Sequence, residues 1–137
     1  MAALCWRVKR GKIEVLLITS RDTGRWVIPK GWPMNGRSDP QAAAIEAWEE
    51  AGVEGEIDDI AMGAFYYDKR HVAKATQTCE VTVYPLRVAR LVPKFPEQNQ
   101  RRRKWFSAQK AAKLVNELGL AGLILRAQTV LQPSKGA

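Results

Sequence analysis

Residues 30–53 read KGWPMNGRSDPQAAAIEAWEEAGV and contain the strongest structural signal in the chain. A loop with two glycines comes first, and a helix is then predicted to begin at Asp39, a good N-cap residue, with Pro40 in the first helical position. The alanines that follow favour helix, and Gly52 stands where a left-handed residue commonly ends one. The stretch therefore predicts a loop followed by a capped helix of about three turns.

Three carboxylates share one face of this predicted helix. Glu46, Glu49 and Glu50 are spaced at i, i+3 and i+4, within reach of one another. Their mutual repulsion needs a counter-charge, and hard oxygen ligands suit a divalent cation such as Mg²⁺ or Mn²⁺. A solvated acidic stripe is the simpler interpretation of a Glu-rich helix. The glycine loop before the helix, its apolar neighbours Ile45 and Trp48, and the basic remainder of the chain favour an active-site helix.

Runs of β-forming residues surround this segment, and two more helical patterns follow them. Strands are predicted at residues 4–8 and 13–19 (a hairpin), 26–28, 60–67, 78–88 and 105–106, and helices from Ser107 to about Leu118 and over 120–131. Strands and helices alternate irregularly, not as repeated βαβ units. This order predicts an α+β fold.

Length and composition indicate one domain. The chain has 137 residues, of which 46% are hydrophobic, enough for a single covered core over residues 1–137. No stretch approaches the roughly 20 apolar residues of a membrane-spanning helix, and no secretory leader is recognisable, so a cytoplasmic protein with no membrane partner is expected. Cys5 and Cys79 stand far apart without neighbouring metal ligands, and we expect both to be small core residues.

The formal net charge is +8, with 22 Lys and Arg against 14 Asp and Glu. A basic surface raises the local concentration of polyanions, which favours phosphate-rich partners. The same charge is also explained if Lys and Arg only keep the surface soluble. The charge by itself leaves both interpretations open.

The loop and helix resemble the Nudix box of the Nudix hydrolase family. That box reads Gly, five residues, Glu, seven residues, Arg-Glu, an apolar residue, any residue, Glu-Glu, any residue, Gly and an apolar residue. The positions that match are Gly31, Glu46, Ala47, Glu49, Glu50, Gly52 and Val53, and residues 26–31 are similar to the family's lead-in to the box. The resemblance extends over nearly the whole chain and implies the Nudix fold, a mixed β-sheet sandwiched between helices (α/β/α).

Two positions depart from that box. Arg37 stands where the family has its first Glu, and Ile45 stands where it has Arg before Glu46. By resemblance, the box Arg orients the helix carboxylates, so its absence removes support from the metal ligands. The expected Mg²⁺ or Mn²⁺ ligands Glu46 and Glu50, assisted by Glu49, remain. We therefore expect hydrolysis to be retained, at a rate that the altered box reduces.

The resemblance also implies a mechanism. Water attacks a phosphorus of a pyrophosphate linkage, and the metal activates the water and neutralises charge on the phosphate oxygens. Glu46, Glu49 and Glu50 are the expected catalytic residues, with Glu49 the preferred general base. Glu80 could be a further catalytic acid from another element, but an exposed strand residue is the preferred interpretation. For His71, a phosphate contact and an ordinary surface position are both open.

Two further stretches are similar to the diphosphoinositol polyphosphate phosphohydrolase branch, namely residues 32–34 and 100–106. Members of that branch cleave diphosphoinositol polyphosphates and dinucleoside polyphosphates such as diadenosine compounds. A cluster of Lys and Arg is the physical requirement for holding such small phosphorylated substrates. The residues predicted to bind substrate are Lys30, Gly31, Arg37, Lys69, Arg70 and Arg103.

Two other functions compete with this one. The altered box would suit a catalytically weakened binding or regulatory module for a phosphorylated ligand. The charge, together with Trp32, Tyr66 and Tyr67 as stacking surfaces, would suit an RNA 5′-pyrophosphohydrolase, although such aromatics more often belong to a core, and a nucleic-acid partner is not favoured. A monomer and a homodimer are both open.

Overall fold

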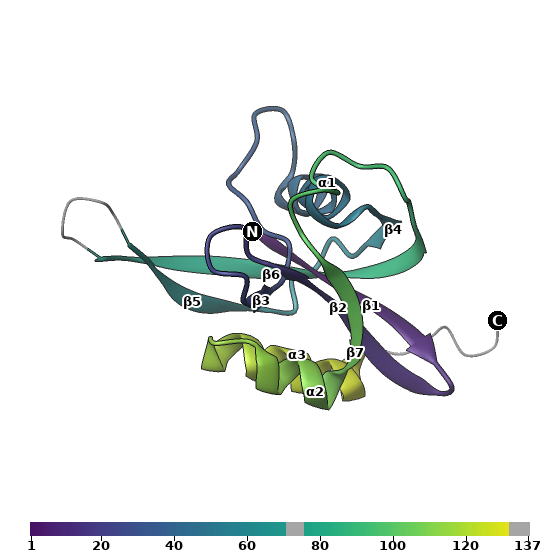
Figure 1. Cartoon of the computed structure of the whole chain (residues 1–137). Helices are drawn as coiled ribbons and strands as arrows, with labels where there is room; N and C mark the ends of the chain where they lie inside the picture. Colours follow the sequence, from purple (N-terminus) through teal and green to yellow (C-terminus); the bar gives the residue numbers. More distant parts are fainter. Residues whose placement is uncertain (71–75, 132–137) are drawn as a thin grey trace.

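The computed structural model describes residues 1–70 and 76–131, and within these ranges one mixed sheet of seven strands carries helices on both faces (Figure 1). The strands are β1 (Ala2–Lys9), β2 (Lys12–Thr19), β3 (Trp26–Val27), β4 (Val53–Ile57), β5 (Gly63–Arg70), β6 (Thr76–Leu91) and β7 (Arg103–Ser107), and the helices are α1 (Asp39–Ala51), α2 (Ala108–Leu114) and α3 (Leu118–Val130). The predicted α+β fold, with a mixed sheet between helices, is confirmed.

Strands β1 and β6 form the middle of the sheet. They run parallel, with Ala2 beside Val83 and Trp6 beside Arg87, and the other pairings between the described strands are antiparallel. Strand β2 pairs with β1 and β3 along one side and with β7 along the other, while β6 also pairs with β4 and β5. The sheet thus brings together segments from both ends of the chain.

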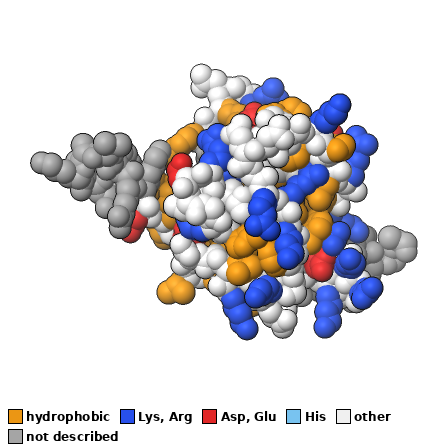
Figure 2. Space-filling view, in the orientation of Figure 1, with side chains coloured by type: hydrophobic (Ala, Val, Ile, Leu, Met, Phe, Trp, Pro, Cys, Tyr) orange, Lys and Arg blue, Asp and Glu red, His pale blue; other side chains and the backbone are white. Residues whose placement is uncertain are grey.

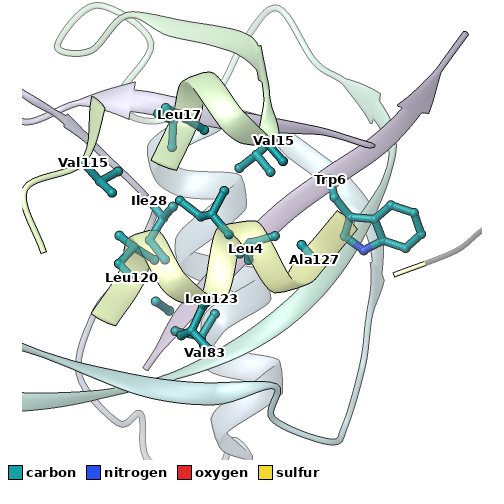
Figure 3. Packing of buried hydrophobic residues seen from close by; sticks show 14 of the residues in the cluster. Leu4, Trp6, Val15, Leu17, Ile28, Val83, Val115, Leu120, Leu123 and Ala127 are labelled. Carbon is teal, nitrogen blue, oxygen red and sulfur yellow. The ribbon is translucent and has the colours of Figure 1, made fainter. Parts of the chain in front are cut away.

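The two faces of the sheet carry separate apolar clusters, because alternate residues of β1 and β2 point to opposite sides. Leu4 and Leu17 pack with α2 and α3, where Leu120 is also buried (Figure 3). Cys5 and Leu16 pack on the other side with the small alanines of α1.

Both cysteines are buried free thiols, as predicted for core residues, and burial raises the pKa of Cys5 to about 12. No helix in the described part of the chain is long and apolar enough to span a membrane.

Helix α1 begins one residue earlier than its sequence indicates. The N-cap is Ser38, not Asp39, because the Ser38 hydroxyl accepts from the Gln41 backbone N–H and the Gln41 side chain accepts from the Ser38 backbone N–H. This reciprocal pair is a capping box. Asp39 is then the first helical residue, where a negative charge still favours the positive end of the helix dipole.

The C-terminal end of α1 is fixed by a left-handed glycine and an arginine from another strand. Gly52 has φ 66°, and its N–H donates to the carbonyls of Ala47 and Trp48. The Arg103 guanidinium donates to the Ala51 carbonyl at 2.8 Å. Strand β4 starts at the next residue, and sequence analysis missed it because Val53 was interpreted only as the apolar contact that follows a helix stop.

Other boundaries also differ from the prediction. Strand β5 runs from Gly63 to Arg70 instead of over 60–67, because it pairs with the start of β6 over eight register positions. Strand β6 continues to Leu91 because β4 pairs with its far end. Helix α2 ends at Leu114 instead of about Leu118, and α3 begins at Leu118 instead of Leu120. A turn separates them, which shortens one helix and lengthens the other.

Replacing Gly52 by Ala is predicted to destabilise the protein more than the same change at Gly11. Both glycines have positive φ, but a Cβ at Gly11 would meet nothing within 4 Å, whereas one at Gly52 would lie 2.5 Å from Phe95 and 2.6 Å from the Arg103 guanidinium. We expect G11A to lower the free energy of unfolding by about 1 kcal/mol and G52A by about 3 kcal/mol in urea denaturation. Equal losses would contradict this account of the helix end.

Candidate active site

A cleft of about 1170 Å³ opens beside α1. Its wall includes Glu46 and Glu50 from α1, Lys30 from the loop after β3, and Glu97 and Arg101 from the loop before β7. Residues of β5 and β6 and of the segment that precedes α3 complete it. The turn between β2 and β3 lines it as well, so side chains that are far apart in the sequence meet here.

Glu50 is the most buried carboxylate in the described part of the chain, with 8% of the residue exposed. Burial raises the pKa of Glu50 to about 7; the nearby Arg101 opposes that rise, while Glu46 and Glu97 add to it. A backbone hydrogen bond from Lys30 also favours the ionised form. The Glu50 carboxylate thus lacks enough positive charge around it to be fully ionised at neutral pH.

Glu46 lies one helical turn earlier, directly against Gly31. A Cβ on residue 31 would overlap the Glu46 carboxylate, so only glycine leaves room for it there. Burial is the main cause that raises the pKa of Glu46, and repulsion from Glu49 and Glu97 raises it further. The glycine of the loop thus lets an acidic side chain of the helix pack against the backbone.

Glu97 is a site residue that sequence analysis missed. Its backbone N–H donates to the Glu49 carbonyl at 3.0 Å, and its side chain, 19% exposed, accepts from Arg101 Nε at 2.7 Å. Its charge acts on both Glu46 and Glu50. The polar loop that carries it has no periodic pattern, and only the spacing of an acid four residues before an arginine hints at the pair.

The cleft is acidic although the protein is basic. The lining residues among those described include eight acids, Asp22, Asp39, Glu46, Glu50, Asp68, Glu80, Glu97 and Glu117, and four bases, Arg21, Arg25, Lys30 and Arg101. Across the whole chain the balance is reversed, at 14 acids to 22 bases. Figure 2 shows Lys and Arg spread over the face that carries β7 and α2. An anionic phosphate would be repelled from most of this wall unless a cation accompanied it.

The donor set fits a hard divalent cation in its chemistry. Glu46, Glu50 and Glu97 offer carboxylate oxygens, the ligands that Mg²⁺ and Mn²⁺ prefer. Burial first, and repulsion between the carboxylates second, raise the pKa values of Glu46 and Glu50, and a bound cation would oppose both effects. In the described residues, no three His, Cys, Asp or Glu side chains already converge as a complete metal cluster. Glu50 instead faces Arg101, with 3.8 Å between its Oε1 and the guanidinium Nη2.

The structure brings together some of the predicted site residues and not others. Lys30, Gly31, Glu46 and Glu50 line the cleft. Glu49 is half-buried and is not among the lining residues, although its charge reaches Glu46.

Two predicted substrate contacts lie elsewhere. Arg37 is exposed in the loop before α1 and does not line the cleft. Arg103 was expected at the rim, but its guanidinium is held by the Ala51 carbonyl and by the Phe95 ring, 4.9 Å away. The side chains of Lys69 and Arg70, and all of His71, lie outside the described residues.

Two of the three aromatic residues proposed as stacking surfaces, Trp32 and Tyr66, are exposed and not core residues, whereas Tyr67 packs against an apolar cluster as expected. Trp32 is 59% exposed and lines the cleft, and Tyr66 is 61% exposed. Tyr67 is half-buried beneath the Lys30 ammonium, which lies 4.8 Å from its ring centre. Glu80 is exposed as predicted, accepts from the Tyr66 hydroxyl at 2.8 Å, and also lines the cleft.

Glu50→Gln is predicted to stabilise the metal-free protein in a pH-dependent way. The folded-state pKa of Glu50, about 7, exceeds its ordinary value of 4.5, so the folded protein binds more protons and loses stability as the pH rises from 4.5 to 7. Glutamine removes this titration. We would measure the free energy of unfolding in urea with EDTA. The difference between E50Q and the unmodified protein should change in favour of E50Q by roughly 3 kcal/mol between pH 5 and pH 8.

Glu54→Gln is the matched control, because Glu54 lies at the surface in an exposed pair with Arg90. Its effect on stability should be nearly the same at both pH values. If E50Q and E54Q showed the same small pH dependence, the claim that burial raises the pKa of Glu50 would be wrong.

Comparison with known proteins agrees with this geometry. The NUDIX domain family model matches residues 1–125. Nudix hydrolase 21, chloroplastic, of Arabidopsis thaliana is 37% identical over 106 residues, which are 76% of this chain and 51% of that protein. Human diphosphoinositol polyphosphate phosphohydrolase 3-beta is 32% identical over 119 residues, 83% of this chain and 66% of that protein. The chain thus spans between half and two thirds of these relatives.

A solved structure supports the same fold. The crystal structure of the C. elegans Ap4A hydrolase superposes with a TM-score of 0.64 over 96% of this chain and 96% of that one, at 22% identity. At that identity the match concerns the fold alone. With the family model covering residues 1–125 and the cleft built around the box helix, the chain belongs to the Nudix family.

Proposed function

We propose that this protein is a Mg²⁺- or Mn²⁺-dependent hydrolase that cleaves a pyrophosphate linkage in a small polyphosphorylated molecule. The observation that carries the proposal is the desolvated group of Glu46, Glu50 and Glu97 in a cleft whose described lining has twice as many acids as bases. Such a wall attracts a divalent cation, and the cation in turn allows a phosphate chain to enter.

The proposed substrates are dinucleoside polyphosphates or diphosphoinositol polyphosphates. Support comes from the relatives: one is named a diphosphoinositol polyphosphate phosphohydrolase, and one structural neighbour is an Ap4A hydrolase. These names describe those proteins, and the chain covers only part of the curated ones. The acidic cleft favours the substrate with fewer phosphates, so we rank the dinucleoside compound first.

The proposed mechanism uses side chains from two sides of the cleft. Glu46 and Glu50, one helical turn apart, would hold the cation, which when bound polarises the phosphate and acidifies water. Glu97, from the loop before β7, would accept a proton from the attacking water as its oxygen bonds to phosphorus and the bridging P–O bond breaks, so that the leaving phosphate keeps the bridging oxygen. Lys30 contributes a positive charge beside Glu50, and burial lowers the pKa of its ammonium group. Glu49 is less suited to accept that proton, since it is not among the described residues that line the cleft.

The two altered positions of the box lie outside the cleft lining. Ile45 lies with Trp48 and Leu86 in a small apolar groove lined by α1, β4 and β6, not in the cleft. An apolar residue is compatible with that groove. Arg37 is likewise outside the cleft lining. These positions support an active hydrolase over a weakened binding module, which remains the alternative that the experiment below distinguishes.

The exposed aromatics keep RNA among the substrates to test. Trp32 lies at the cleft wall with 59% of its surface exposed, and bases stack on aromatic side chains. Stacking would serve a dinucleotide equally well.

A cytoplasmic location stays a prediction, and the relatives named above include a chloroplastic protein.

Cleavage of a substrate panel is the direct test. The purified protein would be incubated with Mg²⁺ or Mn²⁺ and diadenosine polyphosphates, diphosphoinositol phosphates, nucleoside triphosphates, nucleotide sugars or 5′-triphosphorylated RNA. We expect cleavage of a diadenosine or diphosphoinositol compound, abolished by EDTA and lowered at least about 100-fold in E50Q, while E54Q keeps its activity. Binding of a panel compound without any turnover would identify a binding module instead.

Glu97→Gln tests the assignment of the proton acceptor. Loss of a general base typically costs 10² to 10⁴ in rate, so we expect kcat of E97Q to fall by about that factor with KM changed less than about threefold. E49Q, measured in parallel, should lose less than E97Q. The reverse order would return the role to Glu49, as sequence analysis had favoured.

A further inference from the structure

Arg101 is a largely buried cation in the wall of the cleft. Its side chain is 10% exposed, and three of its nitrogens face protein oxygens. Nε donates to Glu97 Oε1 at 2.7 Å, Nη1 donates to the Thr19 carbonyl at 3.1 Å, and Nη2 lies 3.8 Å from Glu50 Oε1. The guanidinium therefore bridges the loop carboxylate and the helix carboxylate.

The rest of the basic run points elsewhere. Arg102 stacks over the Trp26 ring, Arg103 caps α1, and Lys104 lies over Phe106. The backbone around Arg101 is held in place as well, because Thr19 and Arg102 exchange two hydrogen bonds, of 3.0 Å and 2.8 Å. Arg101 is therefore presented to the cleft by a loop fixed to the end of β2.

Helix α1 supplies no positive charge of its own. It contains no Lys or Arg, and the box position that would carry one is Ile45, whose side chain lies in the apolar groove outside the cleft lining. The groups that lower the pKa of Glu50 are the Arg101 charge and a hydrogen bond from the Lys30 backbone, in that order. The orientation of the carboxylates thus depends on a residue outside the box.

We infer that Arg101 is a positioning residue that aligns Glu50 with Glu97 and compensates for the absent box arginine. This inference rests on the proposed function. A planar guanidinium can hold two carboxylates in a fixed relation through separate N–H groups, which an ammonium group does less well. A direct phosphate contact is the competing role, and it is disfavoured because Nε and Nη1 already donate to protein oxygens.

Mn²⁺ affinity without substrate tests the inference independently of turnover. Removing a positive charge should by itself strengthen cation binding, so a weaker affinity in Arg101→Gln can arise only from lost alignment. We expect R101Q to bind Mn²⁺ about 10-fold more weakly in electron paramagnetic resonance titrations. R102Q, the neighbouring exposed arginine, is the matched control and should match the unmodified protein. Unchanged or tighter binding in R101Q would overturn the inference.

Kinetics separate positioning from substrate binding. If Arg101 acts through Glu97, R101Q should lower kcat by 10- to 100-fold with KM changed less than threefold, and R101Q added to E97Q should cost little more than E97Q alone. R101K, which keeps the positive charge but lacks the planar guanidinium, should recover only part of the lost kcat. A raised KM with kcat intact, or fully multiplying effects in the double variant, would assign Arg101 to the substrate instead.

The two measurements also separate this inference from the proposed function. Thermal unfolding of each variant shows whether it is folded, and R101K supplies a milder change if R101Q is not. If the unmodified protein binds Mn²⁺ but cleaves nothing, the proposed function fails, while the Mn²⁺ affinities of R101Q and R102Q still decide the role of Arg101.

Discussion

Partial desolvation of the α1 carboxylates is the constraint on which the site depends. Glu50 is buried with Glu46 nearby and Glu97 opposite, and the described cations around them do not balance the charge. A solvated carboxylate binds a divalent cation only weakly because water already stabilises both charges, whereas a desolvated carboxylate gains more from the cation. Burial of Glu50 therefore lowers the stability of the metal-free protein and, for the same reason, strengthens the binding of a cation at this carboxylate.

The surrounding fold keeps those carboxylates in place. The capping box at Ser38 fixes where α1 starts, and Gly52 with Arg103 fixes where it ends. Gly31 brings the preceding loop against Glu46, and the amino group of Met1 donates to the Gly31 carbonyl at 3.0 Å. The sheet below carries apolar residues on both faces, so it serves as a rigid support for a site made mostly from loops.

Local patterns in the sequence correctly predicted the helix, the presence of Glu46 and Glu50 at the cleft, and the α+β order. Those features have a short-range cause, namely helix spacing, alanine content and a terminal glycine. Glu97 was not recognised as a site residue, and Arg101 was not distinguished from the rest of the basic run, because their placement depends on β7 pairing with β2 and on Thr19 holding the loop. Such long-range contacts cannot be predicted from the local periodicity of the sequence. The arginine run was interpreted as one surface, yet each of its side chains points to a different partner.

The position of a bound cation tests the central claim most directly. Anomalous diffraction from a crystal grown with Mn²⁺ would locate the ion without reference to any substrate. The account predicts a peak in the cleft, in contact with the carboxylates of Glu46 and Glu50. A well-ordered protein with no peak there, or with Mn²⁺ bound only on another face, would contradict it.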